Sequence, residues 1–135
     1  MNAPMAAPTV ETLRGVPLFA ELDNKELQSI AGSMRERTFK AGETVVQEGA
    51  SGAGFFVVEG GEAEVTVNGQ SRGTLGAGDH FGEIALLTGS DRTATIVAKT
   101  DFHCYGLTPW DFKPLVETNP EIAWKLLQSM AERLS

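Results

Sequence analysis

One segment of the chain, residues 81–96, combines a glycine, a carboxylate and an arginine in an arrangement suited to anion binding. Gly82 precedes a short apolar stretch that we expect to form a helical turn. A glycine there lets a ligand approach exposed backbone amides, and a helix N-terminus carries about half a unit of positive charge. Arg92, at the start of the next expected strand, could add charge-assisted hydrogen bonds worth roughly 1.5 to 3 kcal/mol each. The segment therefore predicts a site for a phosphate-type anion.

Glu83 lies in the same segment and would repel an anion placed beside it. The conflict disappears if Glu83 faces another part of the ligand and accepts hydrogen bonds from hydroxyl groups. A ligand that carries one phosphate charge next to a sugar hydroxyl satisfies both Glu83 and Arg92. The alternative is purely structural: Glu83 and Arg92 pair with each other, and Gly82 only turns the chain.

The remaining reactive side chains form no recognisable catalytic or metal-binding motif. His80 and His103 are distant from each other, and Cys104 is the only cysteine. A zinc site, a cupin-type metal site, a haem site or an iron–sulfur cluster therefore lacks its set of ligands. No serine, cysteine or lysine nucleophile stands in a motif with a base. We expect a ligand-binding protein that is not an enzyme and has no metal or other cofactor.

Size and charge restrict the partners of the chain. Its 135 residues are enough for one domain with one core. The net charge of −7 opposes a nucleic-acid backbone or an anionic membrane as a partner. No apolar run approaches the roughly 20 residues of a membrane span, and the N-terminus does not read as a secretory signal. A single cysteine excludes an internal disulfide and favours a cytoplasmic location.

The elements that must position the segment follow the order helix, strand, helix. We expect a flexible leader at residues 1–9 and a single domain over 10–135, with N-terminal helices over 10–37, a β-roll over 38–107 and C-terminal helices over 108–135. The predicted fold is mainly β with flanking helices. Its centre is an antiparallel, jelly-roll-like β-roll that contains a short phosphate-binding helix.

Local patterns support this division. Asp23 and Glu26 form a capping-box pattern at the start of an amphipathic helix. Short β-type runs, separated by glycine-containing turns about ten residues apart, are typical of a sandwich or jelly roll. Pro109 and Pro120 mark the beginnings of two later helices. The last helix has a broad apolar face, which we expect to dock on the β-roll; a partner helix or a lid over a ligand is the alternative.

The segment resembles the phosphate-binding cassette of the cyclic nucleotide-binding domain family, to which catabolite activator protein, protein kinase A regulatory subunits and cyclic nucleotide-gated channels belong. The resemblance rests on Phe81-Gly82-Glu83-Ile84-Ala85-Leu86-Leu87, followed by Arg92-Thr93-Ala94-Thr95-Ile96. Supporting marks are Leu18-Phe19, Ala41-Gly42-Glu43, Glu48-Gly49, and Phe55-Phe56-Val57-Val58 with Gly60 shortly after. It covers nearly the whole chain, from about Leu18 to Leu134.

The resemblance implies a site for cAMP or cGMP and a role for each residue of the cassette. The backbone amides of Gly82, Ile84 and Ala85 would bind the cyclic phosphate. Arg92 would bind the same phosphate through its guanidinium, and Glu83 would accept a hydrogen bond from the ribose 2′-hydroxyl. Both side-chain roles agree with the chemistry argued above from the residues alone.

Other positions would complete the site. Thr93 would add a hydroxyl beside the phosphate or toward the base, without deciding between cAMP and cGMP. Asp91 stands where many relatives have proline, and we expect its carboxylate to face solvent rather than to pair with Arg92. Val65 and Leu75, on the β-roll, are the candidates for contact with the base.

A lid over the base would come from the last helix. Leu127, Met130 and Arg133 are the candidates by position. The family's lid extends further than Ser135, and the stronger alternative is that these residues only pack the helix.

Together these inferences predict a freestanding regulatory sensor. Binding of a cyclic nucleotide would move the C-terminal helices and change the surface offered to a protein partner. No helix-turn-helix follows the roll, so we expect no direct DNA binding. The alternatives are an interaction module that keeps the fold without binding a nucleotide, and the regulatory fragment of a larger protein. Exposed apolar residues such as Trp124 would also allow a homodimer through the last helix.

Overall fold

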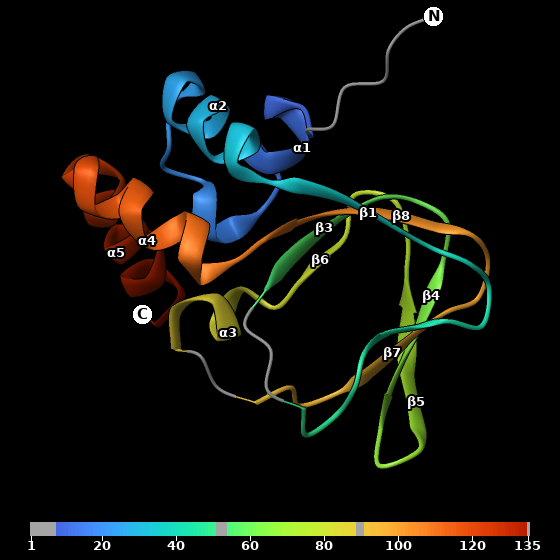
Figure 1. The fold of residues 1–135 in the computed structure, drawn as a ribbon. Coiled ribbons are helices and arrows are strands. Elements are labelled where there is room, and N and C mark those ends of the chain that lie inside the picture. The colour runs from blue at the N-terminus through green and yellow to red at the C-terminus, as the bar shows by residue number, and fades with distance from the viewer. Residues whose placement is uncertain (1–7, 51–53, 89–90, 135) are drawn as a thin grey trace, which may run out of the picture.

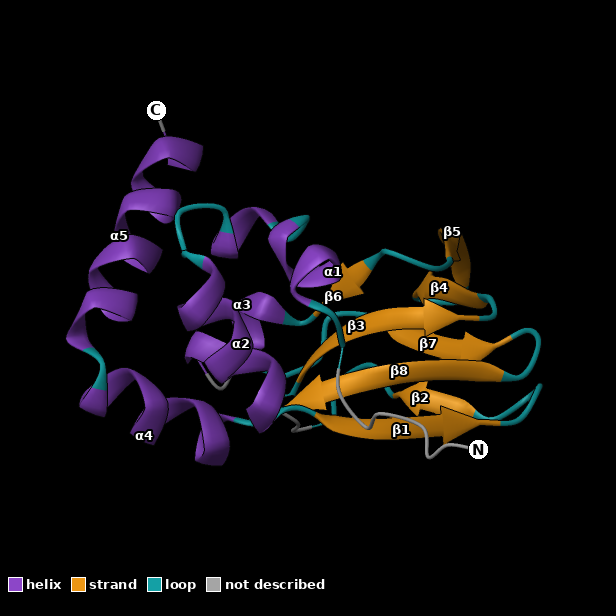
Figure 2. Cartoon of the chain, turned by 90° about the horizontal axis from the view of Figure 1, so that it is seen from above, coloured by secondary structure: helices purple, strands orange, loops and turns teal. Residues whose placement is uncertain are grey.

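The structure is a computed structural model that describes residues 8–50, 54–88 and 91–134, including all of their side chains except those of residues 83–85 and 133. The helices gather on one side of the molecule and the strands on the other (Figures 1 and 2). The predicted fold class is confirmed, because two antiparallel sheets are flanked by helices and interrupted by one short helix.

The elements begin with a helical part made of α1 (Val10–Arg14), the 3-10 helix η1 (Pro17–Phe19) and α2 (Asn24–Ser33). The roll consists of β1 (Arg35–Phe39), β2 (Thr44–Val46), β3 (Phe55–Gly60), β4 (Ala63–Val67), β5 (Gln70–Leu75), β6 (His80–Phe81), α3 (Glu83–Thr88), β7 (Thr95–Ala98) and β8 (Phe102–Leu107). The chain then forms α4 (Pro109–Thr118) and α5 (Pro120–Leu134). Within the described ranges, none of these helices has the length and apolar character needed to cross a membrane.

The strands form two four-stranded sheets. One sheet has the order β1-β8-β3-β6, and the other has the order β2-β7-β4-β5. Neighbouring strands are antiparallel in both sheets. The short helix α3 lies between β6 of the first sheet and β7 of the second, so it connects the two sheets.

The N-terminus differs from the prediction of a flexible leader over residues 1–9. Pro8 is buried, and the Thr9 side chain accepts a 3.2 Å hydrogen bond from the Thr12 amide, which caps α1. Pro8 and Thr9 therefore belong to the folded domain. Residues 1–7 lie outside the described part of the chain.

The first strand begins earlier than predicted. Helices were expected over residues 10–37, but α2 ends at Ser33 and β1 begins at Arg35. β1 pairs with β8 along its whole length and is the edge strand of its sheet. Its side chains are mostly exposed, so the apolar alternation that marks a half-buried strand is missing from the sequence.

β3 joins the two hydrophobic clusters of the domain. Side chains of a strand alternate between its faces. Phe55 and Val57 belong to the cluster beneath the helices, whereas Phe56 and Val58 belong to the cluster between the two sheets. All four residues are buried, so β3 carries both the attachment of the helices and part of the interior of the roll.

The last helix shares a hydrophobic cluster with residues of the roll, but most of its contacts are with other helices. α5 packs on η1 and α4, and its residues Ile122 and Leu126 are buried in the cluster beneath the helices. The 3-10 helix η1 lies between α5 and strand β3. Phe19 of η1 contacts Phe55 of β3 edge to face, with ring centroids 5.6 Å apart. The views in Figures 1 and 2 agree that α5 lies at the outer side of the helical layer, away from the sheets.

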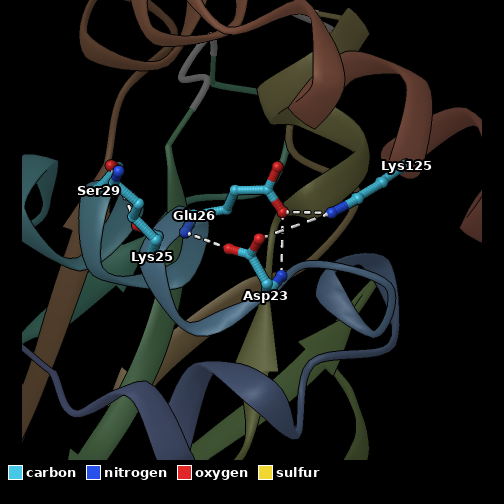
Figure 3. Close-up of polar contacts among 5 residues, drawn as sticks. All are labelled: Asp23, Lys25, Glu26, Ser29 and Lys125. Carbon is cyan, nitrogen blue, oxygen red and sulfur yellow. Dashed lines mark hydrogen bonds and ion pairs between the residues drawn. The ribbon is translucent and has the colours of Figure 1, made fainter.

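A charged contact joins α5 to the capping box of α2, as Figure 3 shows. The predicted box is confirmed: the Asp23 side chain accepts from the Glu26 amide, and the Glu26 side chain accepts from the Asp23 amide. The same Glu26 oxygen, Oε1, accepts a 2.7 Å hydrogen bond from Lys125 Nζ. This hydrogen bond is the largest cause that raises the pKa of Lys125. The start of α2 and the middle of α5 are therefore held together.

Replacement of Lys125 by methionine should lower the thermal midpoint of unfolding, because the Glu26 carboxylate loses its cation. Lys25→Met is the matched control: Lys25 is next to Glu26 in sequence but exposed, and its replacement should leave the midpoint nearly unchanged. Because the pKa of Lys125 is raised in the folded state, the pair stabilises fully below about pH 10.4, the pKa of a free lysine. Its contribution is lost as the pH rises through the higher pKa of the folded state. Thermal melts at pH 8 and above pH 11 measure this; an equal effect of Lys125→Met at both would contradict the account.

Candidate functional site

The predicted anion site begins at Gly82, directly before α3. The glycine has a φ of +92°, in the left-handed region, and its carbonyl accepts the first helical hydrogen bond of α3 from Leu86, at 3.0 Å. A Cβ atom built on Gly82 would lie 2.4 Å from the Gly54 carbonyl oxygen and 2.9 Å from a guanidinium nitrogen of Arg92. Both the backbone conformation and the lack of space therefore require glycine here.

Arg92 follows α3 in the sequence, whereas Gly82 precedes it, and the fold brings the two residues together. Its backbone is held at both ends, because its amide donates to the Ala50 carbonyl at 3.0 Å and its carbonyl accepts from the Gly49 amide at 2.8 Å. Its side chain donates from Nη2 to the Gly54 carbonyl at 2.8 Å. The guanidinium carbon lies 5.8 Å from the centroid of the Phe56 ring. The fold thus brings Arg92 to the start of α3.

The electrostatics of Arg92 favour an anion. Its side chain is partly buried, and this burial lowers the pKa of the guanidinium from its ordinary value, because desolvation disfavours the charged form. Among the side chains that the structure describes, no carboxylate lies within 4.0 Å of this guanidinium. A partly desolvated cation beside a helix N-terminus would gain both charge and hydrogen bonds from a phosphate group.

The rest of the cassette falls partly outside the described side chains. Residues 83–85 form the first turn of α3, which places their backbone at the helix N-terminus beside Gly82. The side chains of Glu83, Ile84 and Ala85 are not among those that the structure describes. The alternative in which Glu83 pairs with Arg92 depends on one of them and therefore also lies outside the described residues.

The two residues on either side of Arg92 are exposed. Thr93, the next residue along the chain, is exposed to solvent and lies two residues before β7 begins. Asp91 is also exposed, in agreement with the expectation that it faces solvent.

The two base candidates lie in the second sheet. Val65 is on β4 and Leu75 is on β5, and both are partly buried. Both pack against the cluster between the sheets, which also contains Phe56. The structure therefore connects them, through one hydrophobic cluster, to the aromatic ring next to Arg92.

The lid candidates lie elsewhere. Leu127 is 58% exposed and Met130 is 39% exposed. Both are on α5, at the outer side of the helical layer, so neither covers the roll in this arrangement. The side chain of Arg133 lies outside the described set. A lid role would require α5 to move toward the roll.

The site includes residues that the sequence did not single out for binding. Gly54 supplies the carbonyl that holds Arg92, and Phe56 supplies the ring beside it. The sequence offered one weak signal, a glycine directly before a strongly apolar strand. The contact itself spans 38 positions of the chain, so no local pattern could reveal it.

The histidines and the cysteine have other surroundings. Burial raises the pKa of the Cys104 thiol to about 12, so it stays protonated at neutral pH. His103 Nε2 lies 2.7 Å from a carboxylate oxygen of Glu36, and the His80 ring lies 6.1 Å from that of Phe55. Within the described part of the chain, no three His, Cys, Asp or Glu side chains are grouped to hold a metal ion.

Comparison with known proteins assigns the chain to a family. The family model described as "Cyclic nucleotide-binding domain" matches residues 36–119. A cAMP-dependent protein kinase regulatory subunit of Yarrowia lipolytica is 42% identical over 90 residues, which are 65% of this chain and 24% of that protein. The chain thus spans about a quarter of the length of that relative.

Two solved structures share the fold. The N-terminal domain of a transcriptional regulator from Streptomyces coelicolor A3(2) has a TM-score of 0.86 and 32% identity, and the match covers 91% of both chains. The catabolite activator protein of Thermus thermophilus has a TM-score of 0.70 and 29% identity over 87% of this chain and 58% of that one. The family model covers more than half of the chain, and its residue range includes Gly82, α3 and Arg92. The chain therefore belongs to the cyclic nucleotide-binding domain family.

Proposed function

We propose that this domain is a regulatory sensor that binds a cyclic nucleotide, cAMP or cGMP, with its phosphate against Arg92 and the start of α3. The observation that carries the proposal is the guanidinium of Arg92, partly buried and in contact with the Gly82 position at the helix N-terminus. The similarity to the Yarrowia relative, a cAMP-dependent protein kinase regulatory subunit, supports the choice of ligand class.

In the proposed complex the ligand meets two kinds of surface. The cyclic phosphate accepts hydrogen bonds from Arg92 and from the first amides of α3, and Glu83 accepts from the ribose 2′-hydroxyl. The base lies against the apolar residues of the second sheet, where Val65 and Leu75 are the candidates. Thr93 lies beside the phosphate, where its hydroxyl can donate.

The signal would pass from α3 to the C-terminal helices. Leu86 and Leu87 of α3 line a groove of about 290 Å³ together with Phe112 and Val116 of α4. A ligand that pulls on the start of α3 would repack this groove and shift α4, to which α5 is joined. The driving force is the difference between the affinities of the ligand for the two arrangements, and a tenfold difference supplies about 1.4 kcal/mol.

The output would be a changed surface for a protein partner. Trp110 is 77% exposed and Trp124 is 58% exposed, so α4 and α5 already offer large apolar side chains. A second copy of the chain, joined through α5, is one candidate for such a partner. We propose a binding role without catalysis or direct contact with DNA, and a cytoplasmic location in keeping with the single cysteine.

Isothermal titration of the domain with cAMP and cGMP in parallel tests the proposal, after a denature-and-refold step to remove any bound nucleotide. We expect saturable binding of at least one ligand with a micromolar Kd, near −8 kcal/mol. A folded, nucleotide-free protein that binds neither ligand would favour an interaction module that keeps the fold without the ligand.

Replacement of Arg92 by alanine should weaken binding by about 1.5 to 3 kcal/mol or more, because the phosphate loses a charged donor. Arg72→Ala is the matched control, since Arg72 is exposed on β5 and its loss removes the same charge from the molecule. Both affinities are measured by the same titration. Equal Kd values for Arg92→Ala and the wild type would show that Arg92 does not bind the phosphate.

Replacement of Gly82 by alanine should weaken binding more than tenfold, because the new Cβ would collide with the Gly54 carbonyl and with Arg92. Gly42→Ala is an unusually close control. Gly42 has the same φ of +92° but no atom within 4 Å of the added Cβ. It therefore carries the same backbone strain without the collision, and its Kd should match that of the wild type. Equal losses in the two variants would mean that strain, and not space at the site, is responsible.

A further inference from the structure

Phe56 lies directly beneath the guanidinium of Arg92. Its ring centroid is 5.8 Å from the guanidinium carbon, within the range of a cation–π contact. The side chain is only 7% exposed, and it belongs to the cluster between the two sheets. It therefore meets both the interior of the roll and the charged group of the site.

The Phe56 ring is itself fixed on several sides. It stacks on Phe81, with ring centroids 5.0 Å apart and an angle of 19° between the planes. A Cβ atom on Gly106 of β8 would lie 2.8 Å from the ring, and one on Gly54 would lie 3.2 Å from it. Two glycines thus make room for the ring, and Phe81, which immediately precedes Gly82, closes the stack.

The chemistry of a ring suits this position. A carboxylate next to Arg92 would hold the guanidinium but would also neutralise the charge that an anion needs. An aromatic face attracts the cation through its quadrupole and offers no anionic oxygen, so it orients the guanidinium without replacing the ligand. The Gly54 carbonyl also orients the guanidinium without adding an anionic charge, because it accepts a hydrogen bond from Nη2.

We propose that Phe56 is a positioning residue of the nucleotide site: its ring, clamped by Phe81, orients Arg92 toward the phosphate. This inference rests on the proposed function, since it assigns a role in the same site. The stacked pair of Phe56 and Phe81 would also have a second role. Because Phe81 and Gly82 are adjacent, the ring that holds Arg92 also fixes the chain at the entrance to α3.

A double-mutant cycle tests the inference by titration with cAMP and cGMP. Phe56→Leu should weaken binding about five- to tenfold in the wild-type background, the size of a partly desolvated cation–π contact. In the Arg92→Ala background the same change should weaken binding less than twofold, because nothing remains to be oriented. Equal losses in both backgrounds would assign Phe56 to the packing of the roll and overturn the proposal.

A control and a rescue complete the design. Phe39 also packs against the cluster between the sheets and carries Arg37 over its ring at 5.4 Å. Phe39→Leu therefore removes the same type of contact away from the site and should leave the Kd unchanged. Phe56→Tyr keeps the aromatic face and should bind within twofold of the wild type; if it loses as much as Phe56→Leu, the proposal fails. If Phe56→Leu does not fold, Phe56→Met takes its place in the cycle.

The outcomes separate the two proposals. If the wild type binds neither nucleotide, the proposed function fails. If the wild type binds and Arg92→Ala weakens binding while Phe56→Leu does not, only the role of Phe56 fails.

Discussion

The site depends on one constraint, the placement of a partly desolvated guanidinium against the start of a short helix. Arg92 can lie there only because Gly82 has no side chain and the loop before β3 offers the Gly54 carbonyl. The guanidinium is more weakly hydrated than an ammonium and stays charged, so it tolerates this burial where a lysine would not. A phosphate bound there, as proposed, would interact strongly with the guanidinium, because the lower local dielectric strengthens a charge-assisted hydrogen bond.

The fold connects this charge to the helices through one strand. Phe56 of β3 lies beneath Arg92, and the neighbouring Phe55 faces the opposite way and contacts Phe19 of η1. The side of the roll that holds the site and the side that holds the helices are therefore two faces of the same strand. In the proposed sensor, β3 would therefore offer a second route from Arg92 to the helical layer, beside the route through α3 and α4. Within the helical layer, the hydrogen bond between Lys125 and Glu26 joins α5 to α2.

Much of this arrangement could be predicted because its signals are local. Gly82 and Arg92 stand a short distance apart around one helix, and the capping box of α2 is contained within four residues. Other features depend on tertiary contacts. The exposed, charged edge strand β1 has no apolar alternation, and the place of α5 depends on the N-terminal helices that cover β3 first. The contacts of Gly54 and Phe56 with Arg92 join distant parts of the sequence, so only the folded chain reveals them.

The central claim, that Arg92 and the start of α3 hold a cyclic phosphate, is tested most directly by a crystal structure of the domain with cAMP bound. The account predicts a phosphate oxygen within about 2.7 to 3.2 Å of an Arg92 guanidinium nitrogen, and another at the amides that follow Gly82. A nucleotide bound elsewhere, or an Arg92 guanidinium paired with Glu83 while the phosphate lies free of both, would contradict it.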